Sequence, residues 1–196
     1  MEPIEEFRYL ILAAQREGAR ALTLALAPVG LTPAQAEALS VLADAERPLS
    51  VKEIGSRLVC EGGSPSRLMS TLAQKGLVES AVGATDRRTT VLSLTAKGID
   101  AARAVGEAEA NLSAALGALL DDGQLATVLP VLRGLVGSLP AGQALACRIA
   151  DRTPADPPPA FRAAVPRSPA VPPAGDAEPQ RWRVSSTAEA AGSDTA

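Results

Sequence analysis

Histidine is absent from this sequence of 196 residues, and only two cysteines, Cys60 and Cys147, are present. The lack of histidine excludes Ser-His-Asp and Cys-His catalysis, histidine zinc sites and histidine-ligated haem. Two cysteines far apart in the chain make neither a disulfide framework nor a metal site. Carboxylate acid-base chemistry stays open, but no clear constellation for it is visible. We therefore expect no metal, no cofactor and no enzymatic activity.

Aromatic residues are also scarce, at 2% of the chain, although 46% of the residues are apolar. The core must then be built from Leu, Val, Ile and Ala, a composition that favours helix-on-helix packing. The N-terminus lacks the basic-then-apolar pattern of a secretory signal, and no run of about 18 apolar residues could span a membrane. We expect a cytoplasmic protein with no membrane partner.

The formal net charge of -3 conceals a gradient along the chain. Residues 47–103 carry nine basic against five acidic side chains, whereas both flanking stretches are acidic. A basic middle segment fits a surface that binds a polyanion. Ordinary variation of surface charge is the alternative explanation for this excess of basic side chains. On charge alone, that alternative is favoured.

The composition changes near Ala150. Residues 150–196 are rich in Pro and Ala and have almost no branched aliphatic side chains. Such a segment cannot bury enough apolar surface to offset its chain entropy, so we predict a disordered tail. Trp182, between two arginines, is either a short docking motif or a chance aromatic, and the second alternative is favoured.

Residues 1–149 form the predicted folded domain, and helix signals divide its first half. Apolar residues at helical spacing predict a helix over 4–27. Thr32-Pro33 with Gln35, and Ser50 with Glu53, are capping boxes that start two further helices. Ser64 as cap and Pro65 at the first helical position start a helix that ends at Lys75, before Gly76. A short extended piece is expected at Pro48-Leu49.

The second half begins with two predicted strands, 77–82 and 89–94, on either side of the loop 83–88. Thr95 caps a long helix, Asp121-Asp122-Gly123 forms a turn, and a last helix covers about 124–139. The predicted fold class is mainly α with a small β-hairpin. Short helices with a tight Gly-containing turn, followed by a hairpin, are typical of a winged helix-turn-helix.

The predicted helix at 64–75 has two different faces. Leu68, Met69 and Leu72 form an apolar stripe, and the opposite side carries polar side chains that can hydrogen-bond to base edges or phosphates. Ser64 and Ser66 lie at its start, where free backbone amides attract a phosphate. The candidate DNA-binding residues of this helix are Ser64, Ser66, Arg67, Ser70, Thr71 and Lys75. Taken alone, an ordinary solvated face is the better interpretation.

The loop between the strands shifts this balance. Arg87 and Arg88 lie at the tip of the predicted hairpin, and inserted arginine is attracted by a narrow minor groove. Asp86 can orient one guanidinium through a bidentate pair. A charged turn without function is the alternative. We favour DNA contact, because the arginines lie where a wing beside a recognition helix would place them.

Several of these motifs resemble the MarR family of bacterial transcription regulators: Leu49–Ile54 (LSVKEI), Leu72–Val78 (LAQKGLV), Asp86-Arg87-Arg88 and Leu92–Gly98 (LSLTAKG). The resemblance covers about residues 4–139. It implies a homodimer whose helices at about 4–27 and 96–139 form the dimer interface, with a DNA-binding lobe at about 32–95. It also implies a repressor that binds a pseudo-palindromic operator in double-stranded DNA. The segment Cys60–Pro65 is richer in Gly and Pro than the family pattern.

The resemblance leaves control and rival functions open. Many relatives are released from DNA by a small-molecule effector, and here the cleft for it would be lined by Leu, Val and Ala. Cys60 is either structural or a redox sensor, and the structural role is favoured because Glu61 beside it disfavours a thiolate. The alternative function is a winged-helix protein-interaction module without sequence-specific DNA binding.

Overall fold

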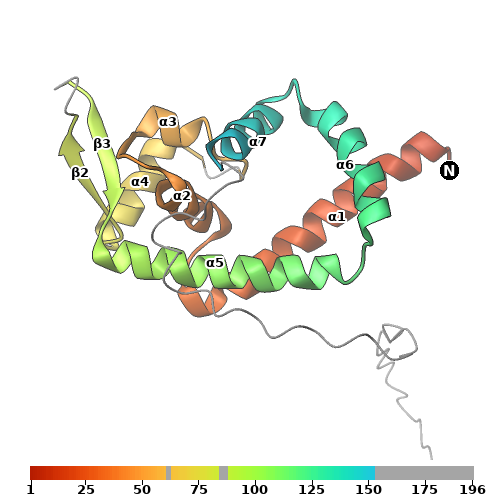
Figure 1. Ribbon diagram of the computed structural model, residues 1–196, viewed down its shortest axis with the longest axis horizontal. Coiled ribbons are helices and arrows are strands. Elements are labelled where there is room, and N and C mark those ends of the chain that lie inside the picture. Colours follow the sequence, from red (N-terminus) through yellow and green to blue (C-terminus); the bar gives the residue numbers. More distant parts are fainter. Residues whose placement is uncertain (61–62, 84–87, 153–196) are drawn as a thin grey trace, which may run out of the picture. The chain divides into compact units, whose positions relative to one another are not determined.

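The computed structural model describes residues 1–60, 63–83 and 88–152. Its contacts divide the chain into two units, Met1–Ala164 and Val165–Ala196, and every described residue belongs to the first. The predicted disordered tail therefore lies outside the described residues beyond Arg152. The elements follow in the order α1 (Pro3–Leu26), the 3-10 turn η1 (Ala27–Val29), α2 (Pro33–Asp44), β1 (Leu49–Ser50), α3 (Val51–Gly55), α4 (Pro65–Gln74), β2 (Val78–Val82), β3 (Thr90–Leu94), α5 (Ala96–Gly117), α6 (Asp122–Val136) and α7 (Pro140–Asp151) (Figure 1).

A small antiparallel sheet with strand order β1-β3-β2 joins the chain before α3 to the β2–β3 hairpin. Strands β2 and β3 form the predicted hairpin, with Val82 opposite Thr90 at its outer end. The predicted extended piece becomes β1, whose Leu49 lies opposite Leu92 of β3. Because α3 starts directly after β1, this pairing fixes α3 relative to the hairpin. The predicted class, mainly α with a β-hairpin in a winged helix-turn-helix, is confirmed.

Most predicted helix starts have the expected capping bonds. Thr32 and Ser50 each accept a hydrogen bond from the backbone N–H three residues later, and both capping boxes are complete. Thr95 caps α5 in the same way, accepting from the Gly98 amide at 3.0 Å. The prediction for Ser64 is wrong in one respect: it occupies the cap position of α4, but its side chain makes no capping bond. Pro65 at the first helical position supplies the start instead.

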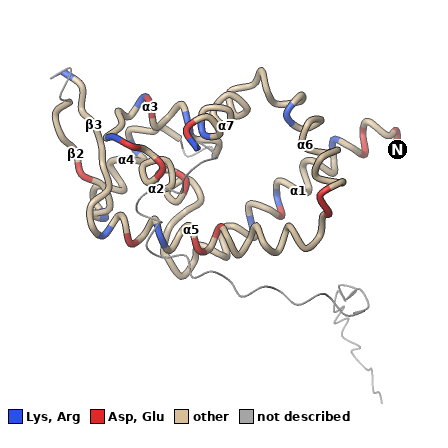
Figure 2. Tube along the Cα trace, viewed as in Figure 1, with Lys and Arg blue, Asp and Glu red and all other residues tan. Residues whose placement is uncertain are grey.

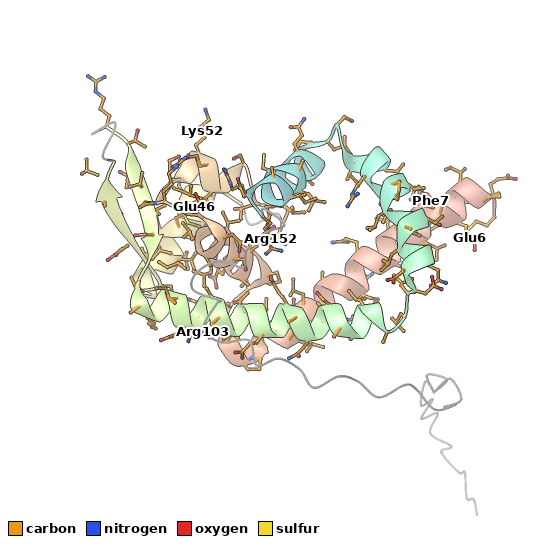
Figure 3. The ribbon with its side chains drawn as sticks, in the orientation of Figure 1. Glu6, Phe7, Glu46, Lys52, Arg103 and Arg152 are labelled. Atoms are coloured by element: carbon orange, nitrogen blue, oxygen red, sulfur yellow. The ribbon has the colours of Figure 1, made fainter. Side chains whose placement is uncertain are left out.

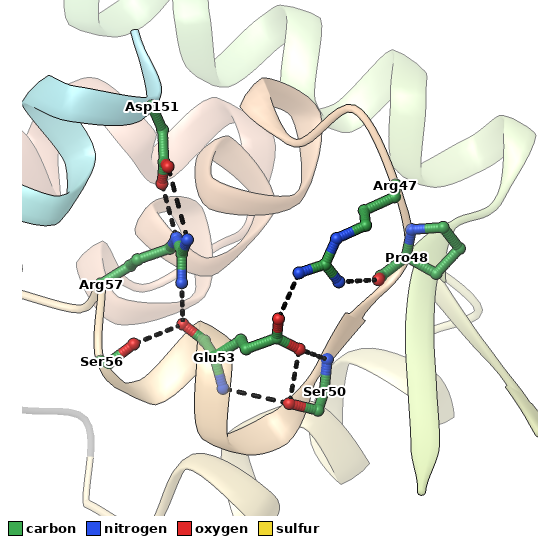
Figure 4. A network of polar contacts seen from close by, with 7 residues as sticks. All are labelled: Arg47, Pro48, Ser50, Glu53, Ser56, Arg57 and Asp151. Carbon is green, nitrogen blue, oxygen red and sulfur yellow. Dashed lines mark hydrogen bonds and ion pairs between the residues drawn. The ribbon is translucent and has the colours of Figure 1, made fainter. Parts of the chain in front are cut away.

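The second capping box is part of a larger polar network (Figure 4). The Glu53 carboxylate accepts from Arg47, and it also accepts from the Ser50 backbone N–H at 2.8 Å and the Ser50 hydroxyl at 2.7 Å. The Arg47 bond, followed by the Ser50 bonds, lowers the pKa of Glu53 to about 2. The start of α3 is therefore stabilised by a carboxylate in its ionised form.

The buried core of the described residues is aliphatic, as the composition predicts. It joins α2, α4, the sheet and the first half of α5, together with Leu26 of α1 and Ile54 of α3. Its fully buried larger side chains are Leu26, Leu39, Ile54, Leu72 and Val105. Helix α4 and the hairpin pack against this core through their buried side chains, and this packing fixes their positions.

Helix α5 approaches the lobe closely at Gly98. A Cβ atom at this position would lie 1.9 Å from the backbone oxygen of Leu77. The same oxygen accepts a hydrogen bond from the Thr95 amide at 3.1 Å. Only glycine permits this approach, so Gly98 fixes how the long helix leaves the hairpin.

The C-terminal part of the domain differs from the prediction. Asp121-Asp122-Gly123 is no free turn, because Asp121 caps α6 and the next two residues are helical. The helix predicted for 124–139 ends at Val136, and a further helix, α7, covers Pro140–Asp151 (Figure 1). We predicted no helix here from the sequence, although Pro140 occupies the first helical position, where proline is favoured.

Within the described residues, no single helix is both long and apolar enough to cross a membrane. Helices α5 and α6 together satisfy the length and composition test, but the chain bends by 110° between them.

Candidate nucleic-acid interface

Helix α4 is amphipathic, and its apolar stripe determines which side chains face solvent. Leu68, Met69 and Leu72 are buried in the core. The opposite face is therefore presented outward, and the candidate residues Ser64, Ser66, Arg67, Ser70 and Lys75 are all exposed, while Thr71 is half-buried. The structure thus brings the six predicted α4 residues together at one surface.

Two hydroxyl groups of this face already donate within the helix. Ser70 donates to the backbone oxygen of Ser66 at 2.9 Å, and Thr71 donates to that of Arg67 at 3.0 Å. A hydroxyl oxygen still has lone pairs to accept a bond when its proton is used elsewhere. In this conformation, the Ser70 and Thr71 hydroxyl oxygens can accept hydrogen bonds from a donor group of a bound partner. Donation to phosphate would require their rotation.

Lys75, at the end of α4, also positions the helix. Its ammonium group donates to the backbone oxygen of Gly30 at 3.0 Å and to the side-chain oxygen of Gln35 at 3.2 Å. Lys97 donates to the backbone oxygen of Lys75 at 2.9 Å. The end of α4 is thereby tied to the loop before α2 and to the start of α5. Sequence reasoning placed Lys75 at the surface and missed this contact, which depends on residues 40 and more positions away.

An open groove of about 470 Å³ runs between the start of α2 and α4. Arg67 and Thr71 line it from the α4 side, and Thr32 and Gln35 line it from the α2 side. A guanidinium beside a helix start forms a surface of positive potential. This surface groove can hold the phosphate backbone of an anionic polymer. The polar face of α4 would then face the groove of that polymer.

The hairpin supplies the second part of the interface. The Gly83 amide donates to the backbone oxygen of Thr89 at 2.8 Å and extends the pairing toward the tip. Arg88 is exposed just before β3. Asp86 and Arg87 lie outside the described residues. Lysine and arginine positions are spread over the lobe (Figure 2), and Lys52 points to solvent from α3 (Figure 3).

The segment that precedes α4 is held by a residue that sequence reasoning missed, Glu37. This α2 carboxylate accepts from the backbone amides of Val59 at 2.9 Å and Cys60 at 2.7 Å, and from Arg148 of α7 at 2.9 Å. A charged residue in the otherwise apolar and small stretch 34–42 was the available signal. Its partners come from distant parts of the chain and could not be read from the sequence.

Burial, followed by the negative charge of Glu37, raises the pKa of the Cys60 thiol to about 11. A thiol with a raised pKa is a poor nucleophile near neutral pH, because the thiolate is the reactive form. This supports the structural role of Cys60 over the sensor role.

Comparison with known proteins agrees with this geometry. Residues 31–98 match the family model described as a winged helix DNA-binding domain. No curated protein matches the sequence. Among solved structures, S. aureus MepR in complex with DNA is similar with a TM-score of 0.62 and 23% identity, over 68% of this chain and 98% of that chain. A mutant of E. coli MarR complexed with operator DNA has a TM-score of 0.60 and 23% identity, over 69% and 99%.

At these identities, the likeness to the solved structures establishes the fold. It agrees with the fold that the motif resemblance implied, and the segment that matches the family model contains α2 to β3 and the start of α5. Residues 31–98 are thus similar to the winged helix DNA-binding domain model, and the chain has the fold of the solved MepR and MarR structures.

Proposed function

We propose that this protein is a sequence-specific DNA-binding transcription regulator, a homodimeric repressor of the MarR type that binds a pseudo-palindromic operator. The observation that most supports this proposal is that one winged helix domain exposes two candidate DNA-binding surfaces. The polar face of α4 is exposed, and Arg88 is exposed at the adjoining wing. Helix α4 would read base edges in the major groove, and the wing arginines would contact the minor groove or the backbone.

The proposed α4 contacts are Ser64, Ser66, Arg67, Ser70, Thr71 and Lys75, and the proposed wing contacts are Asp86, Arg87 and Arg88. Arg67 suits a guanine edge or a phosphate, because its guanidinium donates in a fork. Lys75 is the weakest of these candidates, since two of its donors bond to Gly30 and Gln35. We expect Lys75 to act mainly by orienting the end of α4.

The homodimer is supported by apolar surface that the single chain leaves uncovered. Large exposed apolar side chains gather on α1 and α6, including Leu10, Ile11, Leu129 and Val131. No residue of α6 is buried. Apolar surface of this extent is typical of an association site, and these helices belong to the predicted dimerisation region. Sedimentation or light scattering should give a dimer, and Leu129→Glu should shift it toward monomer.

Operator binding can be tested by selecting bound sequences from a random duplex pool with full-length protein. Wild type is expected to enrich a pseudo-palindrome. Arg88→Ala should bind the enriched duplex roughly tenfold more weakly. Arg103→Ala is the matched control, because it removes the same charge from α5 (Figure 3). There Arg103 pairs with Asp100 of the same helix.

The salt dependence of binding separates this function from a protein-interaction module. Each phosphate contact lowers the logarithm of affinity by about 0.9 per logarithm of salt concentration. A regulator contacting several phosphates in each half-site should show a steep slope. Failure to enrich any duplex in low salt would contradict the proposal and favour the protein-interaction module. Release by a small molecule is a further part of the proposal, and ligands that lower operator affinity would support it.

A further inference from the structure

Helix α7 and its C-cap residue Arg152 are joined to the helix-turn-helix by three ion pairs between residues far apart in the sequence. Arg148 pairs with Glu37 at 2.9 Å, Asp151 with Arg57 at 2.6 Å, and Arg152 with Asp44 at 2.9 Å. The signs alternate along α7, so each charge meets an opposite charge on α2 or after α3. Electrostatic complementarity therefore contributes to the position of α7.

The Glu37–Arg148 pair differs from the others in its burial. The side chains are 6% and 19% exposed, respectively. Both oxygens of Glu37 are engaged: one accepts from Arg148 and the Val59 amide, and the other from the Cys60 amide. A buried carboxylate that loses its cationic partner is strongly destabilised. Arg148 therefore sustains the carboxylate that binds the two amides.

The second pair acts on the same segment. Arg57, just after α3, donates from Nε and Nη2 to the two oxygens of Asp151, and from Nη1 to the backbone oxygen of Glu53 (Figure 4). Arg148 and Asp151 are three residues apart, so they lie on one face of α7. This face contacts the segment 57–60 twice, directly at Arg57 and through Glu37 at Val59 and Cys60.

The segment 57–60 lies close to the start of α4. Cys60 lines the same groove as Arg67 and Thr71. At the end of α3, a Cβ on Gly55 would lie 3.0 Å from Pro65 Cγ, so the two helices are in contact where α4 begins. A shift of residues 55–60 would therefore displace the first turn of α4.

We propose that α7 positions the recognition helix: Arg148 and Asp151 hold residues 57–60, and Glu37 and Arg148 are positioning residues for DNA binding. The proposal rests on the proposed function for its consequence, although its structural part concerns the free protein. Without Arg148, the Glu37 carboxylate is no longer a stable hydrogen-bond acceptor for the Val59 and Cys60 amides. The start of α4 then samples orientations that do not fit the DNA groove.

The test compares Arg148→Gln with Arg152→Gln in the full-length protein. Both variants remove one positive charge and one ion pair, from α7 at Arg148 and from its C-cap at Arg152, but the Arg152–Asp44 pair touches no amide of the segment before α4. Affinity for the duplex enriched by wild type should fall on the order of tenfold in Arg148→Gln and by much less in Arg152→Gln. The salt slope should also become shallower in Arg148→Gln alone, because phosphate contacts of α4 are lost.

Hydrogen exchange in the absence of DNA tests the structural part separately. The Val59 and Cys60 amides should exchange faster in Arg148→Gln, with unchanged exchange in the buried part of α5. Arg148→Lys keeps the charge, and it replaces Arg148→Gln if that variant does not fold. It should show the same pattern with smaller size. Equal exchange and equal affinity in the 148 and 152 variants would overturn the proposal.

The two proposals fail in different ways. If wild type enriches no duplex, the proposed function fails, and the exchange rates alone decide whether α7 holds the segment. If wild type binds an operator and Arg148→Gln binds it as well as Arg152→Gln does, DNA binding stands and the positioning role is refuted.

Discussion

Replacing Gly98 by alanine should destabilise the protein, although alanine is the better helix former. The added Cβ would lie 1.9 Å from the Leu77 backbone oxygen, whereas real Cβ atoms essentially never come within 3.0 Å of such an atom. The oxygen must then retreat by about 1 Å. It cannot do so freely, because Leu77 is buried and its oxygen also bonds to the Thr95 amide at 3.1 Å. The strain therefore falls on the junction of α5 with the lobe.

The magnitude follows from two opposing effects. Forcing extra atoms into a packed site costs about 1–3 kcal/mol. Alanine returns about 1 kcal/mol through helix propensity. The atom that is struck belongs to the backbone and cannot rotate away, so we place the clash above the usual range. We expect a net loss of about 2 kcal/mol in the free energy of unfolding, which lowers Tm by about 4–8 °C for a domain of this size.

The assay is guanidinium unfolding followed by circular dichroism at one fixed protein concentration, because dimerisation would make stability depend on concentration. Gly117→Ala is the matched control, since it lies in the same helix and a Cβ there meets nothing within 4 Å. It should leave stability unchanged or raise it by up to about 1 kcal/mol. A Gly98→Ala protein as stable as wild type would refute the argument from close approach.

Three further predictions concern single side chains. The pKa of about 11 predicts that Cys60 reacts with iodoacetamide at pH 8 far more slowly than the exposed Cys147, as mass spectrometry would measure. Thr32→Ala removes the α2 cap and should lower the free energy of unfolding by about 1 kcal/mol in chemical denaturation. The lowered pKa of Glu53 stabilises the fold above about pH 4.5, and this contribution is lost as pH falls toward 2. Glu53→Gln should therefore have a lower free energy of unfolding than wild type at pH 6, and the two values should converge near pH 2.

Each of these has an outcome that would contradict it. Equal alkylation rates of the two cysteines would contradict the raised pKa of the Cys60 thiol. Thr127→Ala is the control for the cap, because that hydroxyl bonds only within its own helix, to Gly123. Equal effects at 32 and 127 would remove the special role of the cap. A difference between Glu53→Gln and wild type that stays constant with pH would rule out the ionised network.

The parts of the fold that were predictable are those with local signals. Thr32, Ser50 and Thr95 mark helix starts because each side chain bonds to an amide three residues away, and such a bond is visible in the sequence. Gly76 marks the end of α4 because its φ of 69° suits glycine. The outward face of α4 follows from the helical period of Leu68, Met69 and Leu72.

The parts that were missed depend on residues far apart in the chain. Nothing near position 37 indicates that its carboxylate binds the amides of Val59 and Cys60, and nothing near Lys75 indicates its bond to Gly30. Ser70 and Thr71 were predicted as surface residues able to hydrogen-bond to base edges or phosphates, and only the structure shows that both hydroxyls donate to their own helix.

The sequence by itself determined the helix order, the hairpin, the aliphatic core and the polar face of α4, because caps, turns and periods act over a few residues. Tertiary structure decided the existence and position of α7, the support behind residues 57–60 and the exact approach at Gly98. Ion pairs such as Arg148–Glu37 join positions 111 residues apart, and a close backbone contact leaves no mark except a single glycine. Such long-range contacts form only when the whole chain packs, so no local pattern can encode them visibly.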